Sequence, residues 1–392
     1  MLIRFHKFVG PQNVDQQRRG SVMILSIGLL IMLFAFTAFS VDIGYVTLTR
    51  AQLQKSADAA ALAANLELFD GWGVSATKTP SQVAAAARAA AVSVAASNEA
   101  GGLQSTYINP NTDVRLGQRQ WDDVNDKWII SWGVAPYNVV EVTTRRDNFG
   151  STKGDQPLNL WFAPVIGPRN ATVSVSSIAA LQPATKTRKI PGRNVDILPY
   201  ALDVQTWDAM LNGSGADNFS YNPATGAVTS GSDGVLEVDL YPYGNKNLPS
   251  GNRGTVDFGH AGNSTADISR QIVHGLNDDD LSYFGGELDF EAVPMSINGD
   301  TGISAGVKDE LTSIIGEPRM IPLFSEVSGP GNNAMYTIVK FVPIRIVYVK
   351  LTGKPSKKKV WIQPAIFNDP TTVAGDTVIT EDSILTGAAI VH

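Results

Sequence analysis

The residues best suited to catalysis lie together in one short stretch, VDFGHAGNST, at positions 256–265. Asp257, His260 and Ser264 are the residue types of an orienting acid, a general base and a nucleophile. They fall within one loop, whereas a triad draws its members from different elements, and no G-x-S-x-G turn presents the serine. Ser264 also has a structural use, because it precedes a helix start that needs an N-cap. We therefore predict that the chain is not an enzyme.

Two acidic clusters could supply oxygen ligands to calcium, which takes six to eight of them. They are Asp278-Asp279-Asp280 and the stretch 122–126, and neither fits the spacing of an EF-hand loop. Solvated turns are the favoured interpretation and a structural calcium ion is the alternative. The chain has no cysteine, which excludes disulfides, thiol nucleophiles, iron–sulfur clusters and cysteine zinc sites. We predict no catalytic, cofactor-binding or metal-binding residue.

Five lysines gather around Gly353 and Pro355: Lys350, Lys354, Lys357, Lys358 and Lys359. They could contact anionic headgroups or a surface polymer. The favoured interpretation is a hairpin tip whose charges keep a strand edge from pairing. The formal net charge is -6 and no phosphate-binding glycine loop occurs, so neither nucleic acid nor a small-molecule substrate is predicted.

The element that must position everything else is an uncharged stretch from Ser21 to Val41. At ~1.5 Å per residue it reaches about 31 Å, the thickness of the hydrocarbon core. Basic residues precede it and Asp42 is the first charge beyond it, so the positive-inside rule keeps residues 1–20 cytoplasmic. A cleaved signal is the alternative, but the apolar run is longer than such signals carry and no A-x-A site follows. We predict a single-pass inner-membrane protein whose bulk is periplasmic or extracellular.

Helical periodicity continues beyond the membrane. An Ala-rich stripe recurs at three- to five-residue steps, while Asp42 and Thr49 lie on other faces. The stripe consists of Val41, Tyr45, Leu48, Gln52, Ala57, Ala60, Ala61, Ala64 and Leu68. Proline is absent between positions 12 and 79, so the pattern predicts one helix from about residue 21 to 69, ended by Gly71 and Gly73.

The apolar anchor is followed by the step VDIGY at 41–45 and by the pattern AQLQKSADAAALAA at 51–64. In this order they make the segment from about residue 18 to 66 resemble the N-terminal segment of TadG-like proteins, assembly components of the Flp (tight adherence) pilus in bacteria. The segment LWFAPVIG at 160–167 and the alternating residues 171–179 also look like parts of such proteins. The matching anchor and signature residues are Arg18, Arg19, Gly20, Asp42, Gly44, Tyr45, Gln52, Asp58, Ala59 and Ala60.

Two positions depart from related patterns. Leu25 stands where type IV-like prepilins carry a glutamate five residues after the cleaved glycine, which argues against prepilin processing at Gly20. The stretch from Asp267 to Gln271 lacks the second serine of the D-x-S-x-S metal site of a von Willebrand A domain. The resemblance therefore does not extend to metal-dependent adhesion.

The body after the anchor reads as α+β, with Gly 36 and Pro 21 spread along the chain. We expect a lobe at 42–181, a linker at 182–194 and a β-rich lobe with short helices at 195–392. The first lobe packs the long helix and a second Ala-rich helix, 81–96, on an antiparallel sheet. In the second lobe, helices are expected at 264–274 and 304–315, and strands at 336–351 and 360–367.

Three functions remain open on the sequence. The favoured one is a non-enzymatic, membrane-anchored component of pilus assembly or surface adhesion, whose partners are membrane lipid and other pilus-assembly or envelope proteins. The alternative is a membrane-tethered extracytoplasmic hydrolase or carbohydrate-binding protein, which predicts a deep cleft collecting Asp257, Asp267, Asp289 or Glu291. A purely structural envelope protein is the third.

Overall fold

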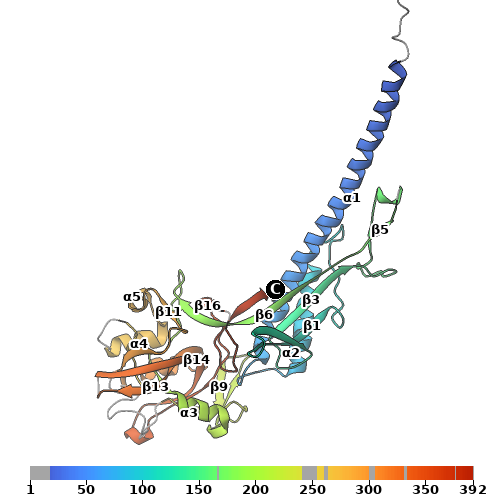
Figure 1. The fold of residues 1–392 in the computed structure, drawn as a ribbon. Coiled ribbons are helices and arrows are strands. Elements are labelled where there is room, and N and C mark those ends of the chain that lie inside the picture. The colour runs from blue at the N-terminus through green and yellow to red at the C-terminus, as the bar shows by residue number, and fades with distance from the viewer. Residues whose placement is uncertain are drawn as a thin grey trace, which may run out of the picture. The chain divides into compact units, whose positions relative to one another are not determined.

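The computed structural model describes residues 18–165, 167–240, 254–259, 264–299, 305–330, 333–375 and 377–391 (Figure 1). Its internal contacts divide the chain into two compact units. The first comprises residues 1–56, 97–107 and 144–175, and the second comprises 57–96, 108–143 and 176–392. These limits differ from the lobes expected at 42–181 and 195–392, because segments distant in sequence join each unit.

Helix α1, Arg18–Leu66, is continuous over 49 residues. Among the described residues it is the one helix long and apolar enough to cross a membrane. It ends three residues before the predicted limit, and a 3-10 turn, Phe69–Gly71, follows. The chain turns sharply at Gly73, whose φ of +75° belongs to the left-handed region that favours glycine.

The predicted buried stripe of α1 is wrong at two of its positions in the first unit. Val41 and Leu48 are 42% and 58% exposed, whereas Asp42 and Thr49 are 4% and 0% exposed. The reason is that loop backbone, rather than a hydrophobic surface, packs on this part of the helix. Polar side chains can satisfy loop N–H and carbonyl groups, so they occupy the buried face.

The remainder of the first unit is a short hairpin and its loops. Strands β4, Leu158–Asn159, and β5, Asn170–Ala171, pair antiparallel. Between them lies the 3-10 turn η2, Ala163–Val165. The hairpin runs alongside α1 in Figure 1. The segment LWFAPVIG at 160–167 therefore forms the tip of this hairpin, with Ile166 outside the described residues.

One antiparallel sheet of the second unit carries helix α2, Pro80–Ala96, on its face. In the described part of the chain its strand order is β11-β6-β3-β1-β2, with β16 and β17 also paired to β6. The strands are β1 Val114–Asp122, β2 Lys127–Trp132, β3 Val139–Arg146, β6 Val173–Arg188, β11 Glu287–Asp289, β16 Thr372–Ala374 and β17 Leu385–Val391. Thr79 caps α2, since its Oγ1 accepts the Gln82 N–H.

A second sheet has the described order β10-β15-β14-β13-β7, with β12 paired to β14. The strands are β7 Leu202–Asp203, β10 Val238–Asp239, β12 Met295–Gly299, β13 Pro318–Ser328, β14 Ala334–Lys350 and β15 Lys359–Pro364. Apolar side chains of β13 and β14 enter two hydrophobic cores, one on Trp207 and the other on Phe258 and Phe324. This burial is the main stabilising term of the β-rich body.

Short helices and one separate hairpin complete the second unit. The helices are α3 Val204–Ala209, with a following turn Met210–Ser214, α4 Thr265–His274, α5 Asp278–Ser282, and α6 Lys308–Ser313, preceded by a turn Ala305–Val307. The hairpin strands are β8 Phe219–Asn222 and β9 Ala227–Ser230. A further turn, Pro355–Lys357, lies at the lysine-rich connection between β14 and β15.

The predicted α+β class is confirmed, and so are the second helix, both short helices of the C-terminal half and the pairing of β14 with β15. Ser304, the predicted start of the last helix, lies outside the described residues. The linker expected at 182–194 begins inside β6, which runs on to Arg188 and pairs there with β11 and β16. Strand β13 was not predicted because Pro318 and Pro322 interrupt its pattern; β7 pairs with it at only Leu323 and Phe324.

Candidate functional site

Asp42 occupies the first turn of α1 beyond the apolar stretch and is buried. Its Oδ1 accepts the Trp161 N–H at 2.9 Å, and its Oδ2 accepts those of Phe162 and Ala163 at 2.9 and 2.6 Å. The three donors open the 3-10 turn η2, whose first N–H groups have no partner within the turn itself. A side chain of α1 thus caps a turn that lies about 120 residues further along the chain.

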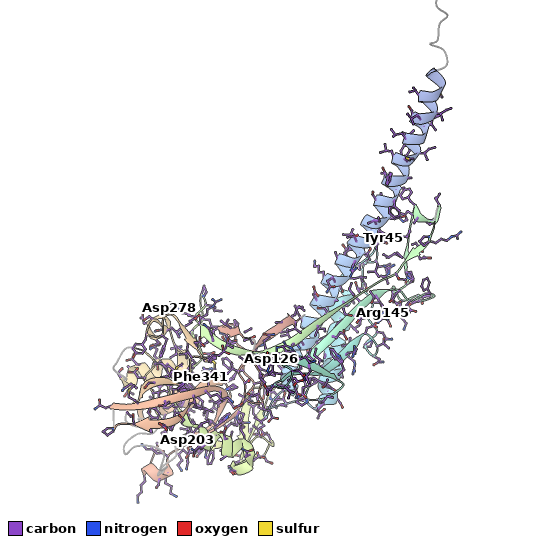
Figure 2. The ribbon with its side chains drawn as sticks, in the orientation of Figure 1. Tyr45, Asp126, Arg145, Asp203, Asp278 and Phe341 are labelled. Carbon is purple, nitrogen blue, oxygen red and sulfur yellow. The ribbon has the colours of Figure 1, made fainter. Side chains whose placement is uncertain are left out.

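Two further side chains of the same helix bind the loop around Gly101. The Tyr45 hydroxyl donates to the Gly101 carbonyl at 2.9 Å, and the Gln52 Oε1 accepts the Gly101 N–H at 3.0 Å. Thr49 lies between them and is fully buried. Figure 2 shows Tyr45 on the side of α1 that faces the hairpin, and its ring stacks on Trp161 at 6.0 Å. Asp42, Tyr45, Thr49 and Gln52 therefore form one docking face.

Arg146 closes the same loop from the end of strand β3. Its Nη1 donates to the carbonyls of Ala100 and Gly101, each at 3.2 Å, and its Nε donates to the Gln156 carbonyl at 2.7 Å. Burial lowers the pKa of this guanidinium, and the neighbouring Tyr45 and Asp155 oppose that change. Arginine stays charged even so, and the buried cation donates hydrogen bonds to three carbonyl oxygens.

The docking face has a structural role, since it holds loops against α1. Asp42, Tyr45, Gln52 and Arg146 each make hydrogen bonds to loop backbone, whereas the Thr49 hydroxyl donates to the Tyr45 carbonyl within α1. Within the described ranges no group of three or more His, Asp or Glu could hold a metal ion. These hydrogen bonds fix the orientation of α1 relative to the loops of its own unit, which is a structural role.

The structure brings only part of the predicted signature together. Asp42, Tyr45 and Gln52 share the docking face, whereas a Cβ added at Gly44 would meet no atom within 4 Å. Arg18, Arg19 and Gly20 begin the helix, and their side chains lie outside the described residues. Asp58 and Ala59 are half-buried, and Ala60 is fully buried in the second unit.

Ala60 belongs to a core in which small residues of α1 and α2 meet a sheet. The alanines that the two helices contribute to this core are Ala60, Ala61, Ala64, Ala84, Ala87, Ala91 and Ala95. Asn65 extends the same face, and its Nδ2 donates to the Ala179 carbonyl at 3.0 Å. The absence of larger side chains lets backbones approach closely, as the Ala-rich stripe predicted for this part of the helix.

Replacing Ala60 by leucine is expected to lower the free energy of unfolding of the second unit by about 1–3 kcal/mol, because the added atoms have no room. The matched control is Ala59→Leu, one position along on the half-buried side, which should cost less than about 1 kcal/mol. Urea unfolding of the full chain in detergent measures both. Equal destabilisation by the two variants would contradict the close packing argued for Ala60.

The residues of the other candidate sites form helix caps, turns and ion pairs. Ser264 caps α4 by accepting the Asp267 N–H, while His260 lies outside the described residues. Asp278–Asp280 form the first turn of α5, where Asp280 makes a bidentate ion pair with Arg270. Asp122 accepts N–H groups of its own turn. Lys359 pairs with Asp239 at 2.7 Å.

Sequence reasoning missed Thr49, Gly101 and Arg146. The spacing of positions 42, 45, 49 and 52 was a usable signal, since these positions fall on one face of a helix. Nothing in the local pattern marks Gly101 as a point of attachment for α1 or Arg146 as buried. The segment LWFAPVIG had been noticed for its likeness to related proteins, and its first residues prove to be the partner of Asp42.

These observations define a class of protein: a chain with one apolar N-terminal helix whose polar continuation docks on loops of a folded α+β body. Residues 20–77 match the family model Tad, described as "Putative Flp pilus-assembly TadE/G-like". The match covers the docking face, the Ala-rich continuation and the following turn, and it confirms the resemblance seen in the sequence. It connects this segment with Flp pilus assembly. Neither the curated proteins nor the solved structures match the chain.

Proposed function

We propose that the chain is a non-enzymatic, membrane-anchored component of Flp pilus assembly. The observation that carries the proposal is the docking face within the matched segment. Asp42, Tyr45 and Gln52 fasten an exposed apolar helix to folded structure through backbone hydrogen bonds. A helix fixed in this way transmits position and orientation between a membrane and a body, which is what an assembly component requires.

The proposed topology follows from charge and length. Residues 1–20 would be cytoplasmic, residues 21–41 would span the inner membrane, and the body would lie in the periplasm or outside the cell. Partners would meet the anchor laterally, since small residues in its sequence permit close helix approach. Gly28 is one of them, and a Cβ added there would meet no atom of the chain within 4 Å.

A Gly28→Leu variant tests lateral association without disturbing the fold of the body. In-cell crosslinking of the full chain followed by affinity capture from membranes is expected to recover pilus or secretion components. The variant should recover several-fold less of them, because leucine at a helix contact keeps the partner backbone away. Ile27→Leu, at a neighbouring exposed position, is the control and should capture as wild type does. Capture of no pilus or secretion component by wild type would contradict the proposed function.

The orientation is testable because the chain contains no cysteine. Val124 is 91% exposed at a turn of the body, so a cysteine placed there accepts a soluble maleimide. We expect Val124→Cys to react in spheroplasts without lysis, because the body lies outside the cytoplasm. A cysteine placed at Leu2 should react only after lysis. The opposite pattern would reverse the topology and remove the periplasmic or extracellular assignment.

The hydrolase or carbohydrate-binding alternative keeps one observation in its favour. Asp257 and Asp267 line a common depression of about 280 Å³. Asp289 and Glu291 do not line it, and Asp289 pairs with Lys186 at 3.1 Å. Asp280, which also lines it, is held by Arg270. Glycan-array binding or polysaccharide hydrolysis that disappears in Asp257→Asn and Asp267→Asn would favour this alternative over pilus assembly.

A further inference from the structure

The tip of the β4–β5 hairpin, residues 160–168, is here named the apolar loop. Its side chains are turned outward although they are large and hydrophobic: Trp161 is 71% exposed, Phe162 44% and Val165 85%. The loop lies alongside α1 rather than away from it, as Figure 1 shows for β5. An outward-facing cluster of this kind marks a surface that another apolar phase covers.

A groove lies beside the apolar loop, and the α1 residues on its other side indicate what covers the loop. This groove has a volume of about 410 Å³ and is lined by Phe162, Ala163 and Val165 from the loop and by α1 residues between Phe34 and Val41. Those α1 residues form the last two turns of the proposed membrane span. Any bilayer that surrounds the span therefore reaches the groove, and lipid acyl chains are its natural occupants.

The backbone N–H groups of the apolar loop meet the part of the lipid condition that concerns donors. In hydrocarbon, every backbone N–H must be satisfied within the protein, since no water is present. Asp42 takes the N–H groups of Trp161, Phe162 and Ala163. Three others bind within the hairpin: Leu160 to the Arg169 carbonyl, Val165 to the Phe162 carbonyl and Gly167 to the Ala163 carbonyl. Pro164 and Pro168 have no N–H, and Ile166 lies outside the described residues.

The depth that the groove would have in the bilayer also suits insertion of the apolar loop. Phe34 precedes Asp42 by eight residues, which is about 12 Å along a helix. Apolar faces that lie in a membrane interface are buried about 5–10 Å below the headgroups. Tyr45, whose ring stacks on Trp161, follows Asp42 by three residues, about 4.5 Å along the helix, where the interfacial belt of aromatic residues is expected.

We propose that the apolar loop is a second membrane contact, which inserts beside α1 into the leaflet facing the body and takes lipid acyl chains into the groove. The inference rests on the proposed anchor and extends it. A helix held in the bilayer by its own apolar surface can still slide and rotate. A loop clamped to it by Asp42 and inserted next to it fixes both its depth and its rotation. Asp42 is the positioning residue of this contact.

Single cysteines carrying an environment-sensitive nitrobenzoxadiazole label test the insertion in the full chain, reconstituted in phosphatidylcholine–phosphatidylglycerol nanodiscs. Val165→Cys reports on the loop, Phe34→Cys on the span and Val124→Cys on solvent. We expect the label at position 165 to emit to the blue of that at 124, to be quenched by nitroxide-labelled lipid and to resist aqueous iodide several-fold better. Adding Asp42→Asn should return the 165 label towards the behaviour of the 124 label.

The three labels distinguish a failure of loop insertion from a failure of the membrane anchor. If the label at 165 is quenched by iodide as strongly as that at 124 while the label at 34 is protected, the loop does not insert and the anchor stands. If the label at 34 is also open to iodide, the anchor itself is wrong. If the label at 165 resists iodide yet is not quenched by lipid nitroxide, protein covers the loop, either a second copy or a partner helix, and the lipid proposal is overturned.

Discussion

A Gly101→Ala variant is expected to lose about 2–5 kcal/mol of stability in the first unit. Gly101 has a φ of +58°, and an alanine in that region costs about 1–2 kcal/mol. Its Cβ would stand 2.7 Å from the Arg146 Nη1 and 2.9 Å from carbons of Thr49 and Leu158. Such overpacking costs about 1–3 kcal/mol more. The docking face would have to open to accommodate it.

Gly102→Ala is the matched control for this effect. Gly102 also has a positive φ, +79°, but its added Cβ would meet only the Tyr45 hydroxyl oxygen, at 3.8 Å. It should therefore cost only the conformational part, about 1–2 kcal/mol. Hydrogen exchange of residues 144–175 in detergent measures both variants. If the two lose protection equally, close packing around Gly101 does not hold the docking face together.

Asp382→Asn is expected to lower the free energy of unfolding of the second unit by about 2–4 kcal/mol. Both carboxylate oxygens accept from Lys340 Nζ, at 2.6 and 2.7 Å. The fully buried Trp207 indole donates to Oδ2 at 3.0 Å, and the Thr380 hydroxyl to Oδ1 at 2.9 Å. An amide keeps one acceptor and leaves Lys340 without its counter-charge. The estimate lies below that for a fully buried pair because Lys340 remains 39% exposed.

This effect depends on pH in a defined direction. Burial raises the pKa of Asp382, but Lys340, Trp207 and Thr380 outweigh it, so the pKa lies below its ordinary value of 3.8. A lowered pKa means that the contribution is fully present above pH 3.8 and is lost as the pH falls through the folded value. Urea unfolding should therefore show a wild-type advantage over Asp382→Asn at pH 7 that shrinks below pH 3.8.

The control for Asp382 is Asp309→Asn, because the Asp309 side chain is 97% exposed and its nearest cation, Lys308, is 3.9 Å away. Exposed pairs of this kind contribute about 0–1 kcal/mol, so this variant should unfold almost as wild type does at either pH. A pH-independent loss in Asp382→Asn would show that packing, rather than the charge, accounts for its effect.

The sequence by itself determined the elements whose patterns are local. The uncharged run, the lack of proline between positions 12 and 79 and the alanine spacing were sufficient for α1 and α2. Alternation and turn residues were sufficient for the β14–β15 pair, and the serine before α4 identified its cap. These features depend on neighbours within a few positions, so no knowledge of the fold was needed. The TadE/G-like segment was recognisable for the same reason.

Only the tertiary structure decided what those elements face. Asp42 and Thr49 were assigned to exposed sides of α1, yet they are buried because loops at 101 and 161–163 pack there. Strand β6 extends into the expected linker as far as Arg188, because β11, β16 and β17 pair with it from distant parts of the chain. The buried Arg146 and the restricted Gly101 depend on contacts 45 residues apart. Partners at such separations leave no periodic trace in the sequence, so the docking face and the apolar loop beside it emerge only from the folded chain.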